Sequence, residues 1–572
     1  MPTVTSARPM DQYEPAAFQV GANSRVKVGR LGQAWLWLAV PVISVLAITH
    51  QSLWMDEGFT VWFAAHRSLG SFYTALIGSP GSTGDPQMLF YLFYMWGWTK
   101  VFGYSELALR AANIPFLLIL LAAVRWATWR LVFVPNLWIL LCLSPFLWFY
   151  LNDARPYVAL MAFAAVAIVS LLAYLVEPAQ YQRRAPWVCL VSLLLALGTH
   201  ILAAFLVPSL VVLILAAVLE TPALKRDLIR NWLRPAVFCS PFFLTLGAFY
   251  SWASAHGVSK EIGEPGLRNL AFILYEFLGF DGLGPPRLEL RENPFVQTFA
   301  PYSALLILGM VPMLATCFFF LRARPPKLVL PLLSSLGVGV AIALGVSKIE
   351  HFQVLGRHMA VFFPLLLLTI LFGAGPFFSL PSGRFAASSA LCGVAVVWAI
   401  SDARLVLLHK YSKDNFRQAA TIAETAVNKD GARIVWVADT HAAEYYGISA
   451  NRSDQPTKNV METEMGRRIS VQAVDGQNWS LDVAGRYVDS SVTPAVLVLS
   501  RPDLFDKQRA WRSLVEQRKA QEIARIPAFS IYKIESFKGE AFDNRLAGDQ
   551  LEVSSNLQPR HIRRMHDGPN HR

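Results

Sequence analysis

Two adjacent carboxylates, Asp56 and Glu57, follow the first long apolar segment of the chain, in the run SLWMDEGF at 52–59. Carboxylates at a membrane boundary are costly to bury, which favours a hydrated or a functional position. One of them could be a general base that removes the proton from an acceptor hydroxyl. The alternative is structural: they cap a helix expected at 58–66, where the helix dipole favours negative charge.

A second group of polar side chains, Asp153, Arg155 and Tyr157, lies in the run NDARPY at 152–157 between two apolar segments. Arginine forms bidentate contacts with phosphate, and the Tyr157 hydroxyl can add a hydrogen bond. An Arg155–Asp153 ion pair at the membrane surface is the structural alternative. Because a turn this short needs few polar groups for folding alone, we expect a phosphate-binding turn with Asp153 as a further substrate contact.

Basic side chains gather a third time between 347 and 358. They are Lys348, His351, Arg357 and His358. A contact with a phosphate or another anionic substrate group would explain them, and surface charge on a loop is the alternative. His200 lies in a tight turn between two apolar segments, where a single histidine is more often structural than functional.

Asp85 stands before Pro86, a pair that is typical of a turn and a helix start, so a capping role is favoured for it. The segment 253–300 carries many ionisable residues and could close over a site, but its spacing indicates no particular chemistry. The sequence has no recognised spacing of four metal ligands, no Walker loop, no dinucleotide fingerprint and no Gly-x-Ser-x-Gly elbow.

The composition explains where these groups must lie. The chain has 572 residues, of which 54% are hydrophobic and 16% charged, and its mean hydropathy is +0.39. Soluble domains are less apolar and more charged. A net charge of +12 would suggest nucleic acid binding in a soluble protein. Here the basic residues cluster in short loops between apolar segments, which the positive-inside rule explains without nucleic acid.

A membrane span needs about 20 mostly apolar residues. Eleven segments qualify: 32–50, 107–124, 136–151, 156–176, 185–199, 201–219, 234–252, 301–321, 328–346, 359–379 and 385–404. The aromatic segment 88–103 is interpreted as an interfacial helix, because counting it as a span would move the basic loops to the opposite side. The charge bias then predicts a cytoplasmic N-terminus and an extracytoplasmic C-terminus. All the polar groups described above fall on the outer side, in the loop 51–106 and the later outer turns.

Four regions are expected along the chain. Residues 1–31 form a basic cytoplasmic tail, and 32–404 form the membrane domain. Residues 405–545 contain short β-branched runs at 433–438, 495–500 and 529–534, which predict a mixed α/β domain outside the membrane. Residues 546–572 are polar and are predicted to be disordered.

The order of the motifs resembles that of membrane glycosyltransferases with a C-type fold, and in particular the family 39-like group. This group includes protein O-mannosyltransferases, the lipid A aminoarabinose transferase and the galacturonosyltransferases of lipopolysaccharide core. The resemblance covers residues from about 30 to about 420. The matching pieces are Trp54-x-Asp56-Glu57, the Pro86 segment, FGYSELALR at 102–110, Ala154-Arg155-Pro156-Tyr157, Thr199-His200, Gly356-Arg357-His358 and YSKDNFR at 411–417. The chain departs from the family where His-Pro-Pro is replaced by Asp85-Pro86-Gln87, and where Arg-Tyr is replaced by Arg357-His358.

The resemblance implies a polyprenyl-phosphate-linked sugar as donor and a lipid, an envelope glycan or a protein as acceptor, at the inner (plasma) membrane. Asp56 would be the base of a single, inverting displacement. Glu57 and Asp85 would support the acceptor or a possible divalent metal, with no cofactor certain. The donor phosphate would be held by Arg155, Tyr157, Arg357 and Lys348, and further substrate contacts would come from Asp153, His200, His351 and His358.

Two other functions compete with glycosyl transfer. A transporter or flippase of lipid-linked sugars predicts ionisable residues in the middle of spans, and often internal repeats. The apolar segments are nearly free of charge, and no repeat is visible. A membrane-anchored binding protein would need only one span.

Overall fold

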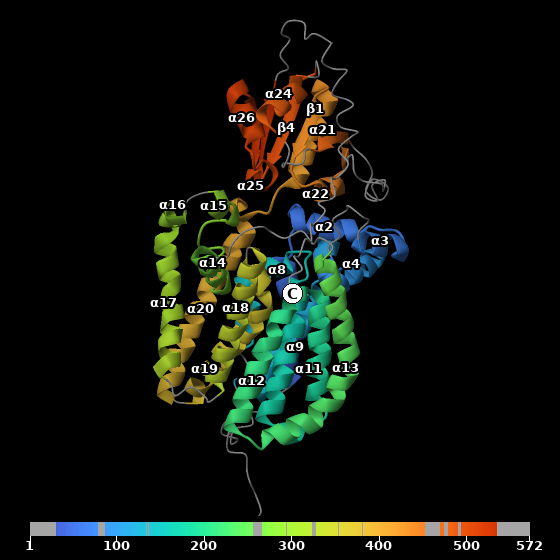
Figure 1. Cartoon of the computed structure of the whole chain (residues 1–572). Coiled ribbons are helices and arrows are strands. Elements are labelled where there is room, and N and C mark those ends of the chain that lie inside the picture. The colour runs from blue at the N-terminus through green and yellow to red at the C-terminus, as the bar shows by residue number, and fades with distance from the viewer. Residues whose placement is uncertain are drawn as a thin grey trace, which may run out of the picture.

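The computed structural model describes residues 30–77, 86–132, 134, 137–255, 266–292, 295–322, 328–352, 354–379, 381–451, 469–473, 479–489 and 493–534. Figure 1 shows two parts, a set of long helices and, above one end of them, a sheet with its own helices. Residues 1–29 of the expected tail 1–31 lie outside the described residues, as do the expected tail 546–572 and Asp85.

Eight helical stretches among the described residues are long and apolar enough to cross a membrane, which makes this a multi-pass membrane protein. They are α5 with α6 (Glu106–Ala111, Ile114–Arg130), α9 (Tyr157–Val176), η3 with α12 (Ile201–Phe205, Leu206–Glu220), α13 (Leu224–Ala255), α17 (Ser303–Arg322), α18 (Val329–Glu350), η5 with α19 (Gly356–Phe362, Phe363–Ser379) and α20 (Pro381–Leu407). Two apolar helices are shorter, α1 (Arg30–Ala47) and α11 (Ala185–Thr199). These ten coincide with ten of the eleven expected spans.

The expected span at 136–151 is wrong as a continuous helix. It is broken into α7 (Ile139–Cys142) and α8 (Pro145–Leu151), because Pro145 has no amide hydrogen for a helix arriving from α7. The Ser144 hydroxyl accepts the amide of Leu147 and starts α8 anew.

The broken segment still runs from one end of the helical part to the other. At one end, Asn113 before α6 donates to the carbonyl oxygen of Asp153 before α9. At the other end, Arg130 of α6 donates to the hydroxyl of Tyr181, which follows α9. Because α6 and α9 therefore run in the same direction, residues 131–152 carry the chain back between the two ends.

Between the long helices and the sheet lie α2 (Met55–Ala64), α3 (Leu69–Ile77), η2 (Pro86–Met88) and α4 (Leu89–Phe102) (Figure 1). The expected interfacial segment at 88–103 is α4, which is not among the eight candidate spans. Trp96 of α4 donates to the carbonyl oxygen of His66, so α4 is tied to the end of α2. Helix α2 itself begins at Met55, three residues earlier than expected, so Asp56 and Glu57 lie inside its first turn.

The remaining helices of the membrane part are short. They are α10 (Pro178–Tyr181), α14 (Leu267–Phe277), α15 (Arg287–Glu292), α16 (Phe295–Phe299), η4 (Ala300–Tyr302) and η6 (His409–Tyr411).

The second part contains a six-stranded sheet in the order β2-β3-β1-β4-β6-β5. Strands β2 (Ile448–Asn451), β3 (Ile469–Ala473), β1 (Arg433–Val437) and β4 (Ala495–Ser500) are parallel, and β6 (Phe529–Ile534) and β5 (Gln521–Ile526) are antiparallel. Its helices are α21 (Phe416–Asp430), α22 (Thr440–Tyr445), α24 (Leu481–Asp489), α25 (Pro502–Phe505) and α26 (Ala510–Arg518). The expected mixed α/β domain at the C-terminal end is confirmed.

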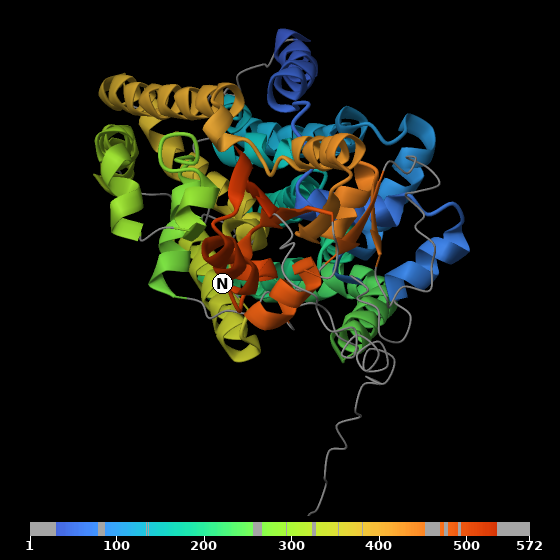
Figure 2. The same cartoon turned by 90° about the horizontal axis from the view of Figure 1, so that it is seen from above.

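The two parts share one hydrophobic core. A single buried cluster joins Leu53 and Phe63 of the first outer segment to Phe416, Trp436 and Ile531 of the α/β part. Seen from above, the sheet lies over the centre of the helical part (Figure 2). The α/β part is thus packed onto the segment around α2, and its residues can reach the side chains of that helix.

The backbones of the two parts approach each other closely at Gly58 of α2. A Cβ atom there would lie 2.4 Å from the Cα atom and 2.5 Å from the backbone nitrogen of Ala442 in α22. Both are backbone atoms that cannot rotate away. Glycine at 58 is therefore what allows α22 to lie directly against α2.

We expect Gly58→Ala to lower the free energy of unfolding by about 1–3 kcal/mol, the usual range for overpacking a tight contact. The measurement is thermal unfolding of the full chain in detergent, with protease release of the α/β part as a second readout. Gly97→Ala in α4 is the matched control, because its Cβ atom would meet nothing within 4 Å. Equal stability of the two variants would contradict the close packing of α2 on α22.

Candidate active site

The first turn of α2 directs its two carboxylates to different places. Trp54 is the extended residue before the helix, and its amide donates to Glu57 Oε2 at 3.2 Å. Successive residues of an α-helix are rotated by about 100°, so Asp56 and Glu57 leave the helix on different faces. One sequence motif thus supplies two carboxylates with separate environments.

Glu57 forms a completely buried ion pair with Arg110. The Arg110 Nε and Nη2 atoms each lie 2.9 Å from one carboxylate oxygen, and neither side chain is exposed. The remaining Arg110 hydrogens are donated to the backbone carbonyls of Thr49, Gln51 and Ser52. All five N–H groups of the guanidinium are therefore used, which is the condition for burying this charge.

Three further donors surround Glu57. Besides Trp54, the amide of Ala154 donates to Oε1 at 2.9 Å, and Lys413 Nζ lies 3.4 Å from Oε2. Burial alone would raise the pKa of Glu57, but Arg110, Lys413 and these hydrogen bonds outweigh it and lower the pKa to about 2. Because both oxygens of Glu57 are occupied, the acceptor or metal contact expected from the sequence would have to displace one of these donors.

Asp56 faces a second arginine from far along the chain. Its Oδ2 atom lies 2.7 Å from Nη1 of Arg357, which belongs to η5, and the Asp56 side chain is 14% exposed. Arg155 reaches the same residue from the 152–157 turn, donating to the Asp56 carbonyl oxygen and to Thr60 Oγ1, both at 3.2 Å. The structure thus brings together Asp56, Arg155 and Arg357, the three residues to which the sequence assigned the chemistry.

Two of the expected contact residues lie beside these arginines. The rings of Tyr157 and His200 are stacked with centroids 6.3 Å apart, and both side chains are buried. Burial, together with the charges of Arg155 and Arg357, holds the pKa of His200 well below its usual value. Its Nδ1 atom accepts the amide of Leu202, so the neutral ring carries its proton on Nε2.

His358 is half-buried next to Arg357. Its Nδ1 atom accepts the amide of Leu355 at 3.1 Å, which caps η5. Its ring therefore has a structural contact as well as a place near the Asp56–Arg357 pair.

Asp153 is buried on the other side of Trp54. Its Oδ1 atom accepts the indole N–H of Trp54 at 2.8 Å and lies 3.5 Å from Lys413 Nζ, while its Oδ2 atom has no hydrogen-bond partner among the described residues. Burial raises the pKa of Asp153, and Lys413 opposes this rise. The pairing of Asp153 is therefore with Lys413 and Trp54.

The described part of segment 253–300 does pack beside the site. Glu276 of α14 is buried against Gly356, the residue before Arg357, and forms an ion pair with Arg287. Burial raises the pKa of Glu276 to about 8, against the opposing charge of Arg287. This segment therefore packs against η5 at Gly356.

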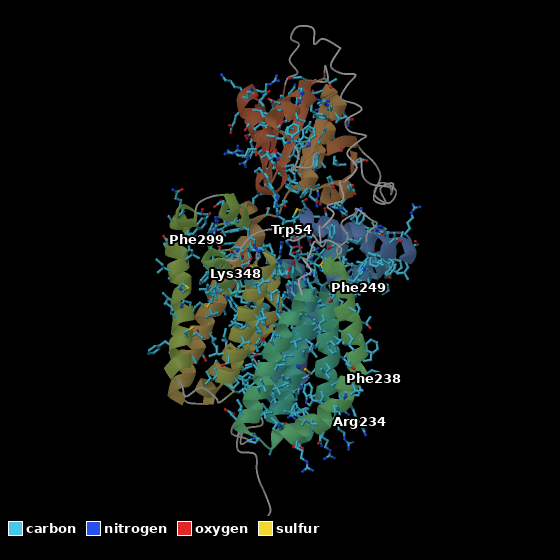
Figure 3. All side chains as sticks on the ribbon, in the orientation of Figure 1. Trp54, Arg234, Phe238, Phe249, Phe299 and Lys348 are labelled. Carbon is cyan, nitrogen blue, oxygen red and sulfur yellow. The ribbon has the colours of Figure 1, made fainter. Side chains whose placement is uncertain are left out.

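Lys348 and His351 do not join the buried group. Both are exposed at the C-terminal end of α18. In Figure 3, Lys348 lies at the upper end of α18, and Trp54 lies where the helical part meets the α/β part.

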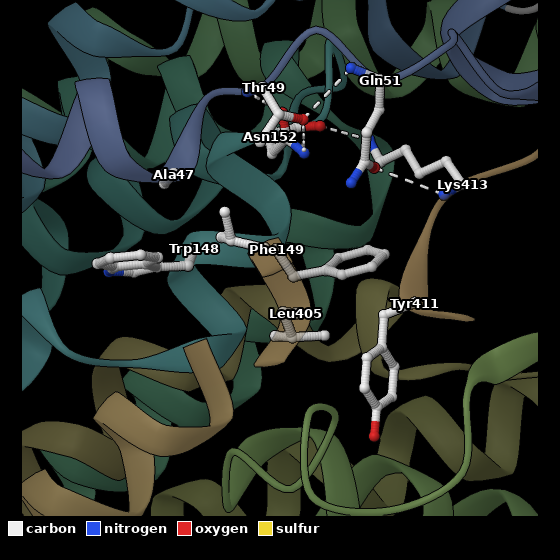
Figure 4. A pocket seen from close by; sticks show the side chains of 10 residues that line it. Ala47, Thr49, Gln51, Trp148, Phe149, Asn152, Leu405, Tyr411 and Lys413 are labelled. Carbon is white, nitrogen blue, oxygen red and sulfur yellow. Dashed lines mark hydrogen bonds between the residues drawn. The ribbon is translucent and has the colours of Figure 1, made fainter. Parts of the chain in front are cut away.

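A pocket adjoins Lys413, between the end of α1, α8 and the end of α20. Figure 4 shows Trp148, Phe149 and Leu405 on its apolar side, and Thr49 and Asn152 on its polar side. Lys413 also lines the pocket. Its ammonium group contacts Glu57, Asp153 and the carbonyl oxygen of Asn152. Through Lys413, the pocket is thus connected to the buried carboxylates Glu57 and Asp153.

The residues do not fit a divalent cation. Asp56, Glu57 and Asp153 each face an arginine, a lysine or an indole N–H. Among the described residues, no group of three His, Cys, Asp or Glu side chains could hold a metal ion. A cation would have to displace positive charges that are already in place.

Three residues of the site were not assigned by the sequence. Arg110 and Lys413 stand within the quoted runs at 102–110 and 411–417, so the resemblance was their signal. Arg501 follows a buried parallel strand of the α/β part, and a polar residue at the carboxyl end of such a strand is a recognised signal for a ligand contact. Its guanidinium lies 5.6 Å from the centre of the Trp54 ring.

No family model and no curated protein matches the chain. Among solved structures, it is similar to ArnT from Cupriavidus metallidurans in the apo state, with a TM-score of 0.49, 13% identity and coverage of 88% of this chain and 98% of that one. The arabinofuranosyltransferase AftD from Mycobacteria has a TM-score of 0.42, 14% identity and coverage of 89% and 40%. The Archaeoglobus fulgidus oligosaccharyltransferase has a TM-score of 0.42, 12% identity and coverage of 83% and 69%. At these scores, the similarity assigns neither an activity nor a residue role.

We expect Glu57→Gln to lower the free energy of unfolding by about 3–5 kcal/mol, because it leaves the buried Arg110 charge without its counter-ion. Thermal unfolding of the full chain in detergent measures this. Glu522→Gln is the matched control: its ion pair with Arg525 at 2.8 Å is exposed, and such pairs contribute about 1 kcal/mol or less.

The same comparison made against pH isolates the charge of Glu57. Since its pKa is about 2 in the folded chain against an ordinary 4.5, its stabilisation is complete above pH 4.5 and is lost as pH falls from there towards 2. The free energy of unfolding of Glu57→Gln should therefore fall less steeply than that of wild type as pH is lowered from 4.5 towards 2. An unchanged slope would show that Glu57 does not carry the stabilising charge.

Proposed function

We propose that the protein is an inverting glycosyltransferase that moves a sugar from a polyprenyl-phosphate donor to a hydroxyl group of an extracytoplasmic acceptor. The observation that carries this proposal is the 2.7 Å contact between Asp56 and Arg357, with Arg155 on the same residue, at the end of a set of membrane helices. A base next to phosphate-binding groups at the membrane boundary suits a lipid-linked donor. The motif order of the chain, which resembles that of family 39-like enzymes, supports the same reaction.

In the proposed reaction, Asp56 accepts the proton of the acceptor hydroxyl while the acceptor oxygen bonds to the anomeric carbon. The bond from that carbon to the phosphate oxygen breaks, and the polyprenyl phosphate leaves. Arg155 and Arg357 offset the charge that develops on the phosphate. Because one displacement occurs at the anomeric carbon, its configuration inverts.

The Asp56–Arg357 contact also gives a way to couple the base to the donor. An ion pair stabilises the charged form of a carboxylate and so weakens it as a base. A donor phosphate at Arg357 would compete with Asp56 for the guanidinium. Asp56 would then become more basic when the donor is in place, which disfavours proton removal at an empty site.

The neighbouring residues take supporting roles in this proposal. Tyr157, His200 and His358 are close enough to the two arginines to contact the donor, and Asp153 positions Trp54. Glu57 holds the turn of α2 in place. Lys348 and His351 are exposed, and the proposed reaction assigns them no role.

The basic loops support the proposed orientation. Arg130 lies at the opposite end of the helical part from the site, because its partner Tyr181 follows α9. Arg234 is at that same far end in Figure 3. By the positive-inside rule, this distribution of charge supports an orientation with the site and the α/β part outside the inner membrane, where envelope glycans, lipids and proteins would be the acceptors.

We expect Asp56→Asn to lower transfer by about 10²–10⁴-fold, the usual contribution of a general base. The measurement is transfer of label from a panel of radiolabelled polyprenyl-phosphate sugars in membranes that contain the protein. Asp430→Asn, an exposed carboxylate at the end of α21, is the control and should retain activity. Equal transfer by wild type and Asp56→Asn would remove Asp56 from the mechanism, and no transfer from any donor would contradict the proposed reaction.

Arg357→Gln should lower kcat/KM for the donor by about 10²–10³-fold, because a charged group aimed at the leaving phosphate is lost. Lys348→Gln removes the same charge from an exposed site and should leave kcat/KM unchanged. Kinetics with the donor identified above measure both. A larger loss in Lys348→Gln than in Arg357→Gln would move the phosphate site to the end of α18.

A further inference from the structure

Arg501 belongs to the α/β part but lies against the candidate active site. It follows β4 and precedes α25, and its backbone has φ 39° and ψ 67°, in the left-handed region that a residue with a side chain adopts rarely. Such strain persists only where the surrounding structure holds it. Its side chain is 9% exposed, with the guanidinium over Trp54, the residue before α2.

The hydrogen bonding of Arg501 is incomplete. Its Nη2 atom donates to Asp414 Oδ1 at 3.0 Å and lies 2.8 Å from Oδ2. Its Nε and Nη1 atoms are buried and have no hydrogen-bond partner among the described residues. Arg110, by contrast, uses all five of its donors. A buried guanidinium with unused donors is costly unless a ligand or a bound water supplies the acceptors.

The neighbours of Arg501 indicate which ligand this is. The guanidinium of Arg357 lies 5.7 Å from the centre of the same Trp54 ring, so two positive groups face one indole. Arg357 also contacts Asp56. The charge of Arg357 acts unfavourably on that of Arg501, and an anion that reached both guanidinium groups would offset this repulsion.

We propose that Arg501 is a third phosphate-binding arginine, which donates Nη1–H to the phosphate of the prenyl-phosphate ligand, so that the α/β part completes the site. This inference rests on the proposed function for the identity of the ligand. The α/β part is then a component of the donor site and not only a cover.

A structural role for Arg501 makes a different prediction. If Arg501 only ties the α/β part to Asp414, removal of either partner should have the same effect. If Arg501 binds phosphate, Arg501→Gln loses the donors, whereas Asp414→Asn keeps them and removes a competing negative charge. The two variants should then differ in phosphate affinity while sharing any loss of stability.

The test is equilibrium binding of farnesyl phosphate to the full chain in detergent, with farnesol as the uncharged probe and pyrophosphate as the lipid-free probe. We expect Arg501→Gln to bind farnesyl phosphate about 10–100-fold more weakly than wild type. Asp414→Asn should bind it as tightly as wild type or more tightly. Arg525→Gln, a side chain that is 69% exposed in the same sheet, is the control and should bind as wild type does. Thermal unfolding of each variant shows that it is folded.

The outcomes separate this inference from the proposed function. Wild-type affinity in Arg501→Gln, or equal losses in Arg501→Gln and Asp414→Asn, would overturn the phosphate role of Arg501. If wild type binds pyrophosphate but neither farnesyl ligand, the lipid-linked donor fails. In that case a weaker binding of pyrophosphate by Arg501→Gln would still support the anion site.

Discussion

Glu57 and Arg110 form the buried ion pair on which the geometry of the site depends. Through Arg110, the pair binds the backbone at 49–52, and through Glu57 it binds the start of α2 and the amide of Ala154. It therefore fixes the first outer segment against the turn that carries Arg155. Neither partner could be lost without leaving a charge in an environment that cannot solvate it. The position of Asp56 depends on this arrangement, because Asp56 is next to Glu57 in the first turn of α2.

The hydrophobic core that the two parts share holds the α/β part in place. Because the α/β part packs directly on α2, with Gly58 against Ala442, it cannot swing freely over the membrane helices. Lys413 and Arg501, which come from beyond the last long helix, thereby reach Glu57 and Trp54. The composition changes near residue 405, but residues on both sides of this point pack into one hydrophobic cluster.

Much of the fold could be predicted because apolarity over about 20 residues is a local property. Ten helices coincide with expected segments, and three strands with expected β-branched runs. The segment 136–151 shows where this reasoning fails. Its apolarity is that of a span, but Ser144-Pro145 divides it, and an apolar broken segment is stable only because neighbouring helices cover its backbone.

The sequence by itself determined the long apolar helices, except at 136–151, and the residue types available for chemistry. It could not separate Asp56 from Glu57, because two adjacent carboxylates are chemically alike. Only the tertiary structure decided their surroundings: the helical rotation sends Glu57 to Arg110 and Asp56 to Arg357, which is 301 residues away. The behaviour of an ionisable group is set by its burial and its charged neighbours, and here those neighbours come from distant segments that only folding brings together.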